Sequence, residues 1–177
     1  MTDKNYILEN PDTGEKFFLK KDLGSIGPSV LDVTSIYSKQ GIFTFDPGFA
    51  ATASCKSDIT YIDGENGILM YRGYPIEVLA KSSSFLEVCF LLLNGELPNQ
   101  DELNNYEKLI SDNSNLDKTV LNTLKGFKND AHPMSILSAM LNSMAAFYHD
   151  SIDINKEDQR NTFNTNIISQ VPTAAAA

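Results

Sequence analysis

Residues 43–80 read FTFDPGFAATASCKSDITYIDGENGILMYRGYPIEVLA, and this stretch alternates backbone turns with short apolar runs. The segments at 59–62 (ITYI) and 68–71 (ILMY) are rich in β-branched and aromatic residues, which predicts two strands. The DGENG segment between them predicts a chain reversal, because glycine and asparagine tolerate positive φ. Pro75 suits the first turn of a helix. The stretch therefore predicts a hairpin that leads into a helix, and spacing alone indicates a structural corner rather than a binding site.

The residues before this hairpin predict more strands. Tyr6–Leu8 and Lys16–Leu19 are strand candidates joined by the turn-rich segment NPDTG, and Val30–Val33 is a third candidate. Strands this short and few do not make a full core by themselves. We therefore predict that residues 1–74 form a small β-rich N-terminal layer.

From Pro75 onward the sequence predicts helices, so the fold class is mainly α. Residues 85–93 are apolar on almost every side, as in a helix that is buried on most sides. After Pro133, apolar residues at Ile136, Leu137, Met140, Leu141 and Met144 form one stripe, which the pattern assigns to ordinary core. Further helices are predicted over residues 98–110, 119–127 and 162–169.

The end of the sequence predicts one more helix. Pro172 is a good helix-start residue, and Ala174–Ala177 are compatible with a helix. Such a helix would stop after about one turn, whereas an isolated helix needs roughly 12 residues to be even marginal. We therefore expect a chain that is truncated at the C-terminus. Its apolar helices 85–93 and 136–144 would then lack part of their cover and promote self-association.

Composition limits the classes of partner and compartment. The 177 residues include 23 acidic and 14 basic side chains, a net charge of −9, and an acidic surface repels nucleic acid. No signal-peptide pattern is present, and the longest apolar run, Val88–Leu93, is far shorter than the ~20 residues of a membrane span. Cys55 and Cys89 lack CxxC spacing. The sequence does not decide whether they form a disulfide, but two thiols favour a reducing compartment. We predict a cytoplasmic protein without nucleic-acid or membrane partners.

Several motifs are more specific than these patterns. In chain order they are FTFDPGF, TASCKSDITYIDG, GILMYRGYPI, LEVCFLLLNGELP, AHPMSIL and AAFYHDS. With this order and spacing, the chain from Val30 to Ala177 resembles bacterial citrate synthase of the hexameric (type II) form. The resemblance implies the citrate synthase fold, incomplete at the C-terminus. Residues 75–177 would then be the start of the large helical domain, with the small catalytic domain absent.

The resemblance also implies an acyltransferase activity. Members of the family condense acetyl-CoA with oxaloacetate and water to give citrate and CoA, at the entry to the tricarboxylic acid cycle. They are homodimers or hexamers, and the helix that carries the HPM motif packs near the subunit boundary. We expect acetyl-CoA and oxaloacetate as substrates of the full-length enzyme, and no separate cofactor.

The chain itself offers few groups for this chemistry. The reaction needs a carboxylate base, an imidazole and several cations for the carboxylates of oxaloacetate. His132 and His149 flank predicted helix ends, where a structural role is expected, and the catalytic His and Asp of the family lie beyond residue 177. For Arg72 we predict a structural ion pair; Arg160 is the other arginine. No metal-ligand or phosphate-binding motif occurs. We predict no catalytic, cofactor-binding or metal-binding residue and an inactive fragment.

A regulatory site is the other possibility that the resemblance raises. Hexameric members are commonly inhibited by NADH, an anionic dinucleotide that needs cationic partners. Extension without gaps from LNGELP to HPM places residues 112–115 where the family pattern is Arg-His-Thr-Met. Arg and Lys of the sensitive members fall at positions 166 and 170, and a nucleotide-contacting tyrosine falls at position 148. The NADH-like positions, predicted to be non-functional, are Asp112, Asn113, Ser114, Asn115, Tyr148, Asn166 and Gln170.

Two alternatives to a citrate synthase fragment stay open. A 2-methylcitrate synthase uses propionyl-CoA in the same chemistry, and the acyl pocket that separates the two lies outside this chain. The N-terminal β-rich layer favours the citrate-forming hexameric type. The second alternative is a stand-alone assembly or binding module without enzymatic activity. A coding frame that continues past Ala177 would favour the enzyme, and a natural stop codon there would favour the module.

Overall fold

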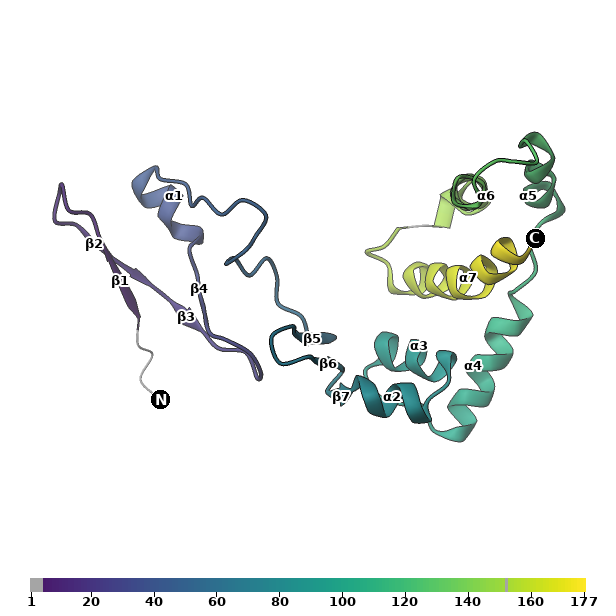
Figure 1. Cartoon of the computed structure of the whole chain (residues 1–177), viewed down its shortest axis with the longest axis horizontal. Coiled ribbons are helices and arrows are strands. Elements are labelled where there is room, and N and C mark those ends of the chain that lie inside the picture. Colours follow the sequence, from purple (N-terminus) through teal and green to yellow (C-terminus); the bar gives the residue numbers. More distant parts are fainter. Residues whose placement is uncertain (1–4, 152) are drawn as a thin grey trace. The chain divides into compact units, whose positions relative to one another are not determined.

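The computed structural model describes residues 5–151 and 153–177 (Figure 1). The described chain is mainly helical with small antiparallel sheets, which confirms the predicted fold class. It divides into two compact units. The first unit contains residues 5–84 and Leu91–Glu96, and the second contains Phe85–Phe90 and Leu97–Ala177.

Three small antiparallel sheets lie in the first unit. Strand β1 pairs with β2, β3 pairs with β4, and β5, β6 and β7 form a three-stranded sheet in that order. The strands are β1 (Tyr6–Glu9), β2 (Lys16–Leu19), β3 (Lys21–Asp22), β4 (Val30–Leu31), β5 (Thr60–Asp63), β6 (Ile68–Tyr71) and β7 (Tyr74–Pro75). The hairpins predicted from residues 6–19 and 59–71 are confirmed to within one residue at each strand end.

A short helix in the first unit was not predicted. It is α1 (Thr34–Gln40), and the Asp32 carboxylate at its start accepts hydrogen bonds from the Thr34 backbone N–H (3.0 Å) and hydroxyl (2.6 Å). At its end Gly41 adopts φ 66° and donates its N–H to the Tyr37 carbonyl at 2.8 Å. Asp before a helix and Gly after it are ordinary start and stop signals, but seven residues are too few for a clear apolar period.

Two helices, α2 (Ile76–Ser82) and α3 (Phe85–Asn94), follow the three-stranded sheet. Arg72, at the turn before β7, donates from Nη2 to the Leu92 carbonyl in the last turn of α3 at 2.8 Å. Those last carbonyls have no partner within the helix and carry partial negative charge, so a guanidinium is well placed there. The predicted ion pair is therefore wrong: among the described residues Arg72 bonds to carbonyl oxygens and joins no salt bridge.

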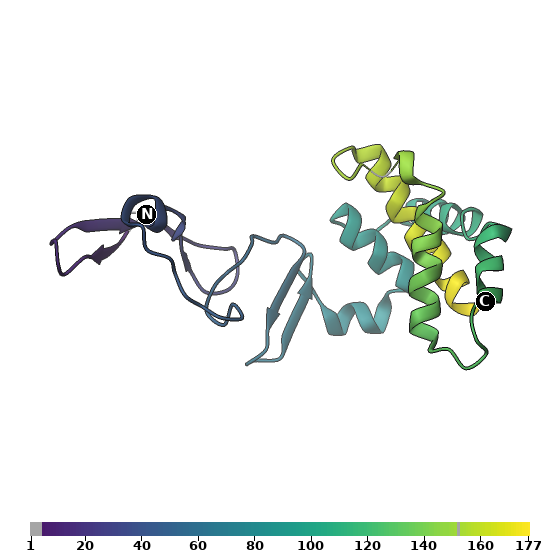
Figure 2. The same ribbon diagram turned by 90° about the horizontal axis from the view of Figure 1, so that it is seen from above.

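The second unit is helical, and its core lies where α5, α6 and α7 meet (Figures 1 and 2). Val120, Met140, Met144 and Ala174 are its buried centre, with Ile136, Leu137 and Leu141 packed against them. The predicted apolar stripe after Pro133 is thus core. The helices are α4 (Gln100–Asp112), α5 (Lys118–Thr123), α6 (Pro133–Ala145) and α7 (Glu157–Ala176), with 3₁₀ segments η1 (Leu124–Gly126) and η2 (His149–Ser151).

Helix α7 corrects the prediction for the C-terminal residues. It is continuous through Pro172, so the helix expected to start there does not exist as a separate element. Proline removes one helical N–H and usually interrupts a helix. Here the next turn is held by tertiary contacts: Ala174 is 5% exposed in the core, and Thr173 donates its hydroxyl to the Ser114 carbonyl at 2.8 Å. The expectation that Pro172 starts a separate helix of about one turn is therefore wrong.

Helices α4 and α7 are joined by side-chain hydroxyls. Ser169 is 3% exposed, and its hydroxyl lies 2.8 Å from the Thr165 carbonyl of its own helix and 3.2 Å from the Asn113 carbonyl just after α4. Together with the Thr173 bond to the Ser114 carbonyl, this contact links the residues just after α4 to α7. At its start, α4 has a capping box between Asn99 and Glu102. Both ends of this helix are therefore fixed by specific bonds.

Candidate functional site

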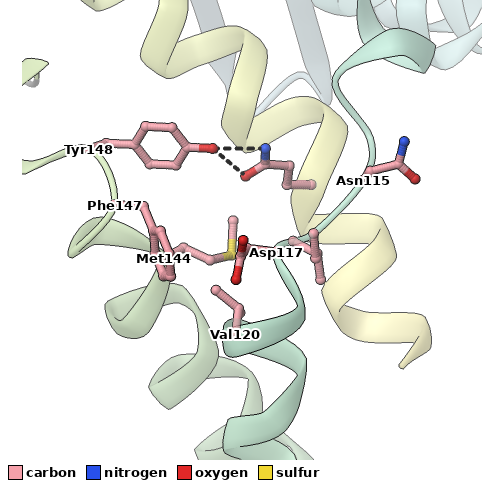
Figure 3. A pocket seen from close by; sticks show the side chains of 8 residues that line it. Asn115, Asp117, Val120, Met144, Phe147 and Tyr148 are labelled. Carbon is pink, nitrogen blue, oxygen red and sulfur yellow. Dashed lines mark hydrogen bonds between the residues drawn. The ribbon is translucent and has the colours of Figure 1, made fainter.

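A cavity lies in the second unit, beside the start of α5, the end of α6 and the second half of α7. Its volume is about 370 Å³, within the range of small-molecule sites. Its walls combine apolar side chains with polar side chains from several elements (Figure 3). The lining residues are Asn115, Leu116, Asp117, Val120, Met144, Phe147, Tyr148 and Gln170.

A hydrogen-bonded pair crosses this cavity. The Gln170 amide Nε2 donates to the Tyr148 hydroxyl at 3.1 Å, and the hydroxyl also lies 3.4 Å from Oε1 of the same amide (Figure 3). Gln170 is 6% exposed. Both residues, with Met144, also line a second cavity of about 70 Å³ formed by α6 and α7. The Tyr148–Gln170 pair is thus the boundary between two neighbouring cavities.

The structure brings together only some of the predicted site residues. Asn115, Tyr148 and Gln170 line the larger cavity, and Asn166 lines the smaller one with the same Tyr148–Gln170 pair. These four positions come from three separate segments of the sequence, and the fold places them around one pair of cavities.

The remaining predicted residues have structural contacts at the end of α4. Asp112 is the exposed last residue of that helix. The Asn113 side-chain amide donates to the Leu109 carbonyl at 2.8 Å, and the Ser114 hydroxyl donates to the Ser111 carbonyl at 2.8 Å. None of the three lines either cavity. Their side chains terminate a helix rather than contribute to the cavity walls.

Asp117, the one charged residue that lines the larger cavity, was not among the predicted site residues. Its carboxylate caps α5 by accepting the Thr119 backbone N–H at 2.6 Å. Hydrogen bonds from Thr119, with Lys118 nearby, hold the pKa of this carboxyl below its ordinary value, so Asp117 is ionised at neutral pH. Asp is a favoured residue just before the first turn of a helix, so the sequence could have predicted that Asp117 caps α5. Neither cavity is lined by Lys, Arg or His.

The two histidines act as structural groups in the second unit. His132 caps α6, with Nδ1 accepting the Met134 N–H at 3.2 Å. His149 is exposed, and its Nε2 lies 3.1 Å from the Asp150 carboxylate. Arg160 donates to the Ile154 carbonyl at 2.9 Å. Both histidines make local contacts near the ends of α6, and neither lines the cavities.

Within 5–151 and 153–177, no three His, Cys, Asp or Glu side chains lie close enough together to hold a metal ion. In the same part of the chain, no helix combines the length and apolar character needed to cross a membrane.

The chain is similar to several solved citrate synthases. The enzyme from Thermotoga maritima MSB8 matches with 29% identity and a TM-score of 0.61, over 75% of this chain and 34% of that one. A ternary complex of the Thermoplasma acidophilum enzyme with carboxymethyl coenzyme A and oxaloacetate matches with 22% identity and a TM-score of 0.62, over 71% and 33%. The Pyrobaculum aerophilum enzyme matches with 23% identity and a TM-score of 0.61, over 98% and 38%.

The last two matches show the fold alone, because their identity is low. In each case the chain spans about a third of the length of the structure that it matches. A family model described as "Citrate synthase, C-terminal domain" matches residues 48–177, which is most of the sequence and includes the β5–β6 hairpin and all of the second unit. On this match, the chain belongs to the citrate synthase family.

Proposed function

We propose that this chain is the N-terminal part of a citrate synthase that condenses acetyl-CoA with oxaloacetate and releases citrate and CoA. The observation that carries the proposal is the family match over residues 48–177 together with the ordered motifs within it. The complex of the Thermoplasma acidophilum enzyme with a coenzyme A derivative and oxaloacetate supports this choice of substrates. The N-terminal β-rich layer favours the hexameric type, assembled from dimers.

The cytoplasm is the compartment that we propose for it. Cys55 is exposed and Cys89 half-buried, and both are free thiols in the structure. Free cysteines are typical of a reducing compartment, where disulfides rarely persist.

We predict that the 177-residue chain alone does not catalyse the reaction. Its arginines contact backbone carbonyls, its histidines lie outside the cavities, and no carboxylate base, imidazole and cations converge among the described residues. Release of CoA from acetyl-CoA, followed with a thiol reagent with and without oxaloacetate, should not exceed the rate without protein. Oxaloacetate-dependent release by the purified chain would contradict this prediction.

The test of the proposed function uses a longer polypeptide. We would express the coding frame that contains this sequence, with any codons that follow Ala177, and measure the same release of CoA. Oxaloacetate-dependent turnover with acetyl-CoA is expected. Faster turnover with propionyl-CoA would instead assign a 2-methylcitrate synthase. A frame that ends at Ala177, with a chain that is well dispersed and inactive, would favour the stand-alone module.

We further predict that NADH binds this chain only weakly. Asp117 is the only ionised residue that lines the larger cavity, and the pyrophosphate of NADH would meet a carboxylate there rather than cations. In a titration that follows NADH fluorescence, saturation below about 1 mM is not expected. A dissociation constant in the micromolar range would contradict the prediction. Asp117→Asn, which can still cap α5, should tighten any residual binding, whereas Asp130→Asn is the matched control for net charge.

A further inference from the structure

Strand β1 has one edge without a partner strand among the described residues, because its sheet contains only β1 and β2. In an antiparallel ladder, hydrogen-bonded and non-hydrogen-bonded residue pairs alternate. The Asn10 N–H bonds to the Glu15 carbonyl at 2.9 Å, so with the observed register the next bonded residues of β1 are Leu8 and Tyr6. The N–H and C=O groups of Ile7 and Glu9 therefore point away from β2, towards the open edge.

The same hairpin exposes large apolar side chains. Tyr6 is 52% exposed, Ile7 58%, Leu8 42% and Phe18 62%, and only Leu19 of the hairpin is buried. A two-stranded hairpin is at best marginally stable in water, and a third or fourth strand usually stabilises it. An open edge with apolar residues on both faces is also the usual place where another strand is added. The hairpin thus has the features of a surface that pairs with another strand.

We propose that β1 pairs antiparallel with β1 of a second copy of this chain, which joins two hairpins into one four-stranded sheet. A two-fold axis at Ile7 places the outward groups of Ile7 opposite those of Ile7 in the second copy. Glu9 then lies opposite Asn5, and Tyr6 opposite Leu8. Every outward-pointing residue meets another outward-pointing residue, so the strand is complementary to itself, as an isologous interface requires.

Charge does not oppose a second copy at this edge. Two chains of net charge −9 repel each other over most of their surfaces, whereas Tyr6, Ile7 and Leu8 are uncharged. Glu9 is paired with Lys16 at 3.4 Å. In the proposed register the two Glu9 residues are four positions apart along the sheet, about 13 Å, which exceeds the Debye length of about 8 Å at physiological salt. The interface therefore brings no unpaired like charges together, and it does not depend on the proposed enzymatic function.

The first test compares two proline variants of the full 177-residue chain by sedimentation velocity over a range of concentrations. Ile7→Pro removes an N–H at the β1 edge without removing a bond to β2, and it should weaken dimerisation at least tenfold. Phe18→Pro is the matched control, because the Phe18 N–H points to the opposite edge of the same hairpin; it should change the dimerisation constant by less than about threefold. A wild-type chain that stays monomeric at about 100 μM, or equal effects of the two variants, would overturn the proposal.

A cross-linking test does not depend on the proline variants being folded. In a Cys55→Ser background, Ile7→Cys places two thiols across the two-fold axis, about 5.5 Å apart between Cα atoms, which a disulfide can span. Mild oxidation should give a covalent dimer from Ile7→Cys at a rate at least tenfold above that from Phe18→Cys. Equal rates would show that the chains associate through unspecific apolar contacts and would overturn the proposed pairing.

Discussion

Replacing Met140 by alanine is expected to lower the free energy of unfolding of the second unit by about 2–5 kcal/mol. Met140 is 1% exposed and belongs to the buried cluster with Val120, Met144 and Ala174, which joins α5, α6 and α7. Truncation to alanine removes most of the buried side chain and leaves a cavity that three packed helices can fill only partly. Since most domains are stable by only about 5–15 kcal/mol, this single change should remove a large share of the total.

Met134→Ala is the matched control on the same helix. Met134 is 63% exposed, so its replacement should change the unfolding free energy by less than about 0.5 kcal/mol. Urea unfolding followed by far-UV circular dichroism, with amide exchange of α6 to localise the effect, measures both variants. If Met140→Ala and Met134→Ala gave the same midpoint, the cluster would not be the core of this unit.

Replacing Arg72 by alanine is expected to destabilise the first unit by about 1.5–3 kcal/mol, because a charged donor is lost from a carbonyl at a helix end. Arg72 Nη2 donates to the Leu92 carbonyl at 2.8 Å and holds the β5–β6 hairpin to the end of α3. The backbone N–H of residue 72, which donates to the Ile59 carbonyl at 2.7 Å, is a direct probe. Its hydrogen exchange should become at least tenfold faster in the variant.

Two further variants separate the side-chain bond from backbone strain. Arg72 has φ 50°, a left-handed conformation that is unfavourable for non-glycine residues. Arg72→Gly should therefore be about 1 kcal/mol more stable than Arg72→Ala, although both lose the guanidinium. Arg160→Ala, which removes the exposed bond to the Ile154 carbonyl, should leave exchange at residue 72 unchanged. Unchanged exchange in Arg72→Ala itself would show that the bond to Leu92 contributes nothing to stability.

Local sequence signals predicted the elements that local chemistry determines. The β5–β6 hairpin follows from β-branched strands around a DGENG turn, and α6 follows from Pro133 and an apolar stripe. Asn99 likewise marks the start of α4, where it forms a capping box. In these segments propensity, turn residues and apolar period all favour the same structure, which is why the sequence is sufficient.

Elements held by distant contacts were missed or misjudged. Helix α7 passes through Pro172, which local rules assign to a helix start, because Ala174 packs in the core and Thr173 bonds to Ser114. Arg72 was predicted to meet a carboxylate, and its partner is instead a carbonyl 20 residues away. A sequence pattern contains no information on which backbone group will lie next to a side chain in the folded state.

The candidate site likewise contains residues that the sequence identified and residues whose position depends on distant contacts. The resemblance identified Asn115, Tyr148, Asn166 and Gln170, which the fold gathers around two cavities. It also included residues 112–114, whose place at the α4 end depends on contacts with α7. Asp117 escaped notice because its cap of α5 is a local feature, whereas its position in the cavity wall is known only from the packing of three helices.

The hydroxyl contacts between α4 and α7 have a consequence for synthesis on the ribosome. Ser169 reaches the Asn113 carbonyl across 56 positions of the chain, and Thr173 reaches Ser114 across 59. At the usual translation rates of about 5–20 residues per second, the end of α4 would wait roughly 3–12 s for these partners. During that interval the end of α4 would lack both of these contacts.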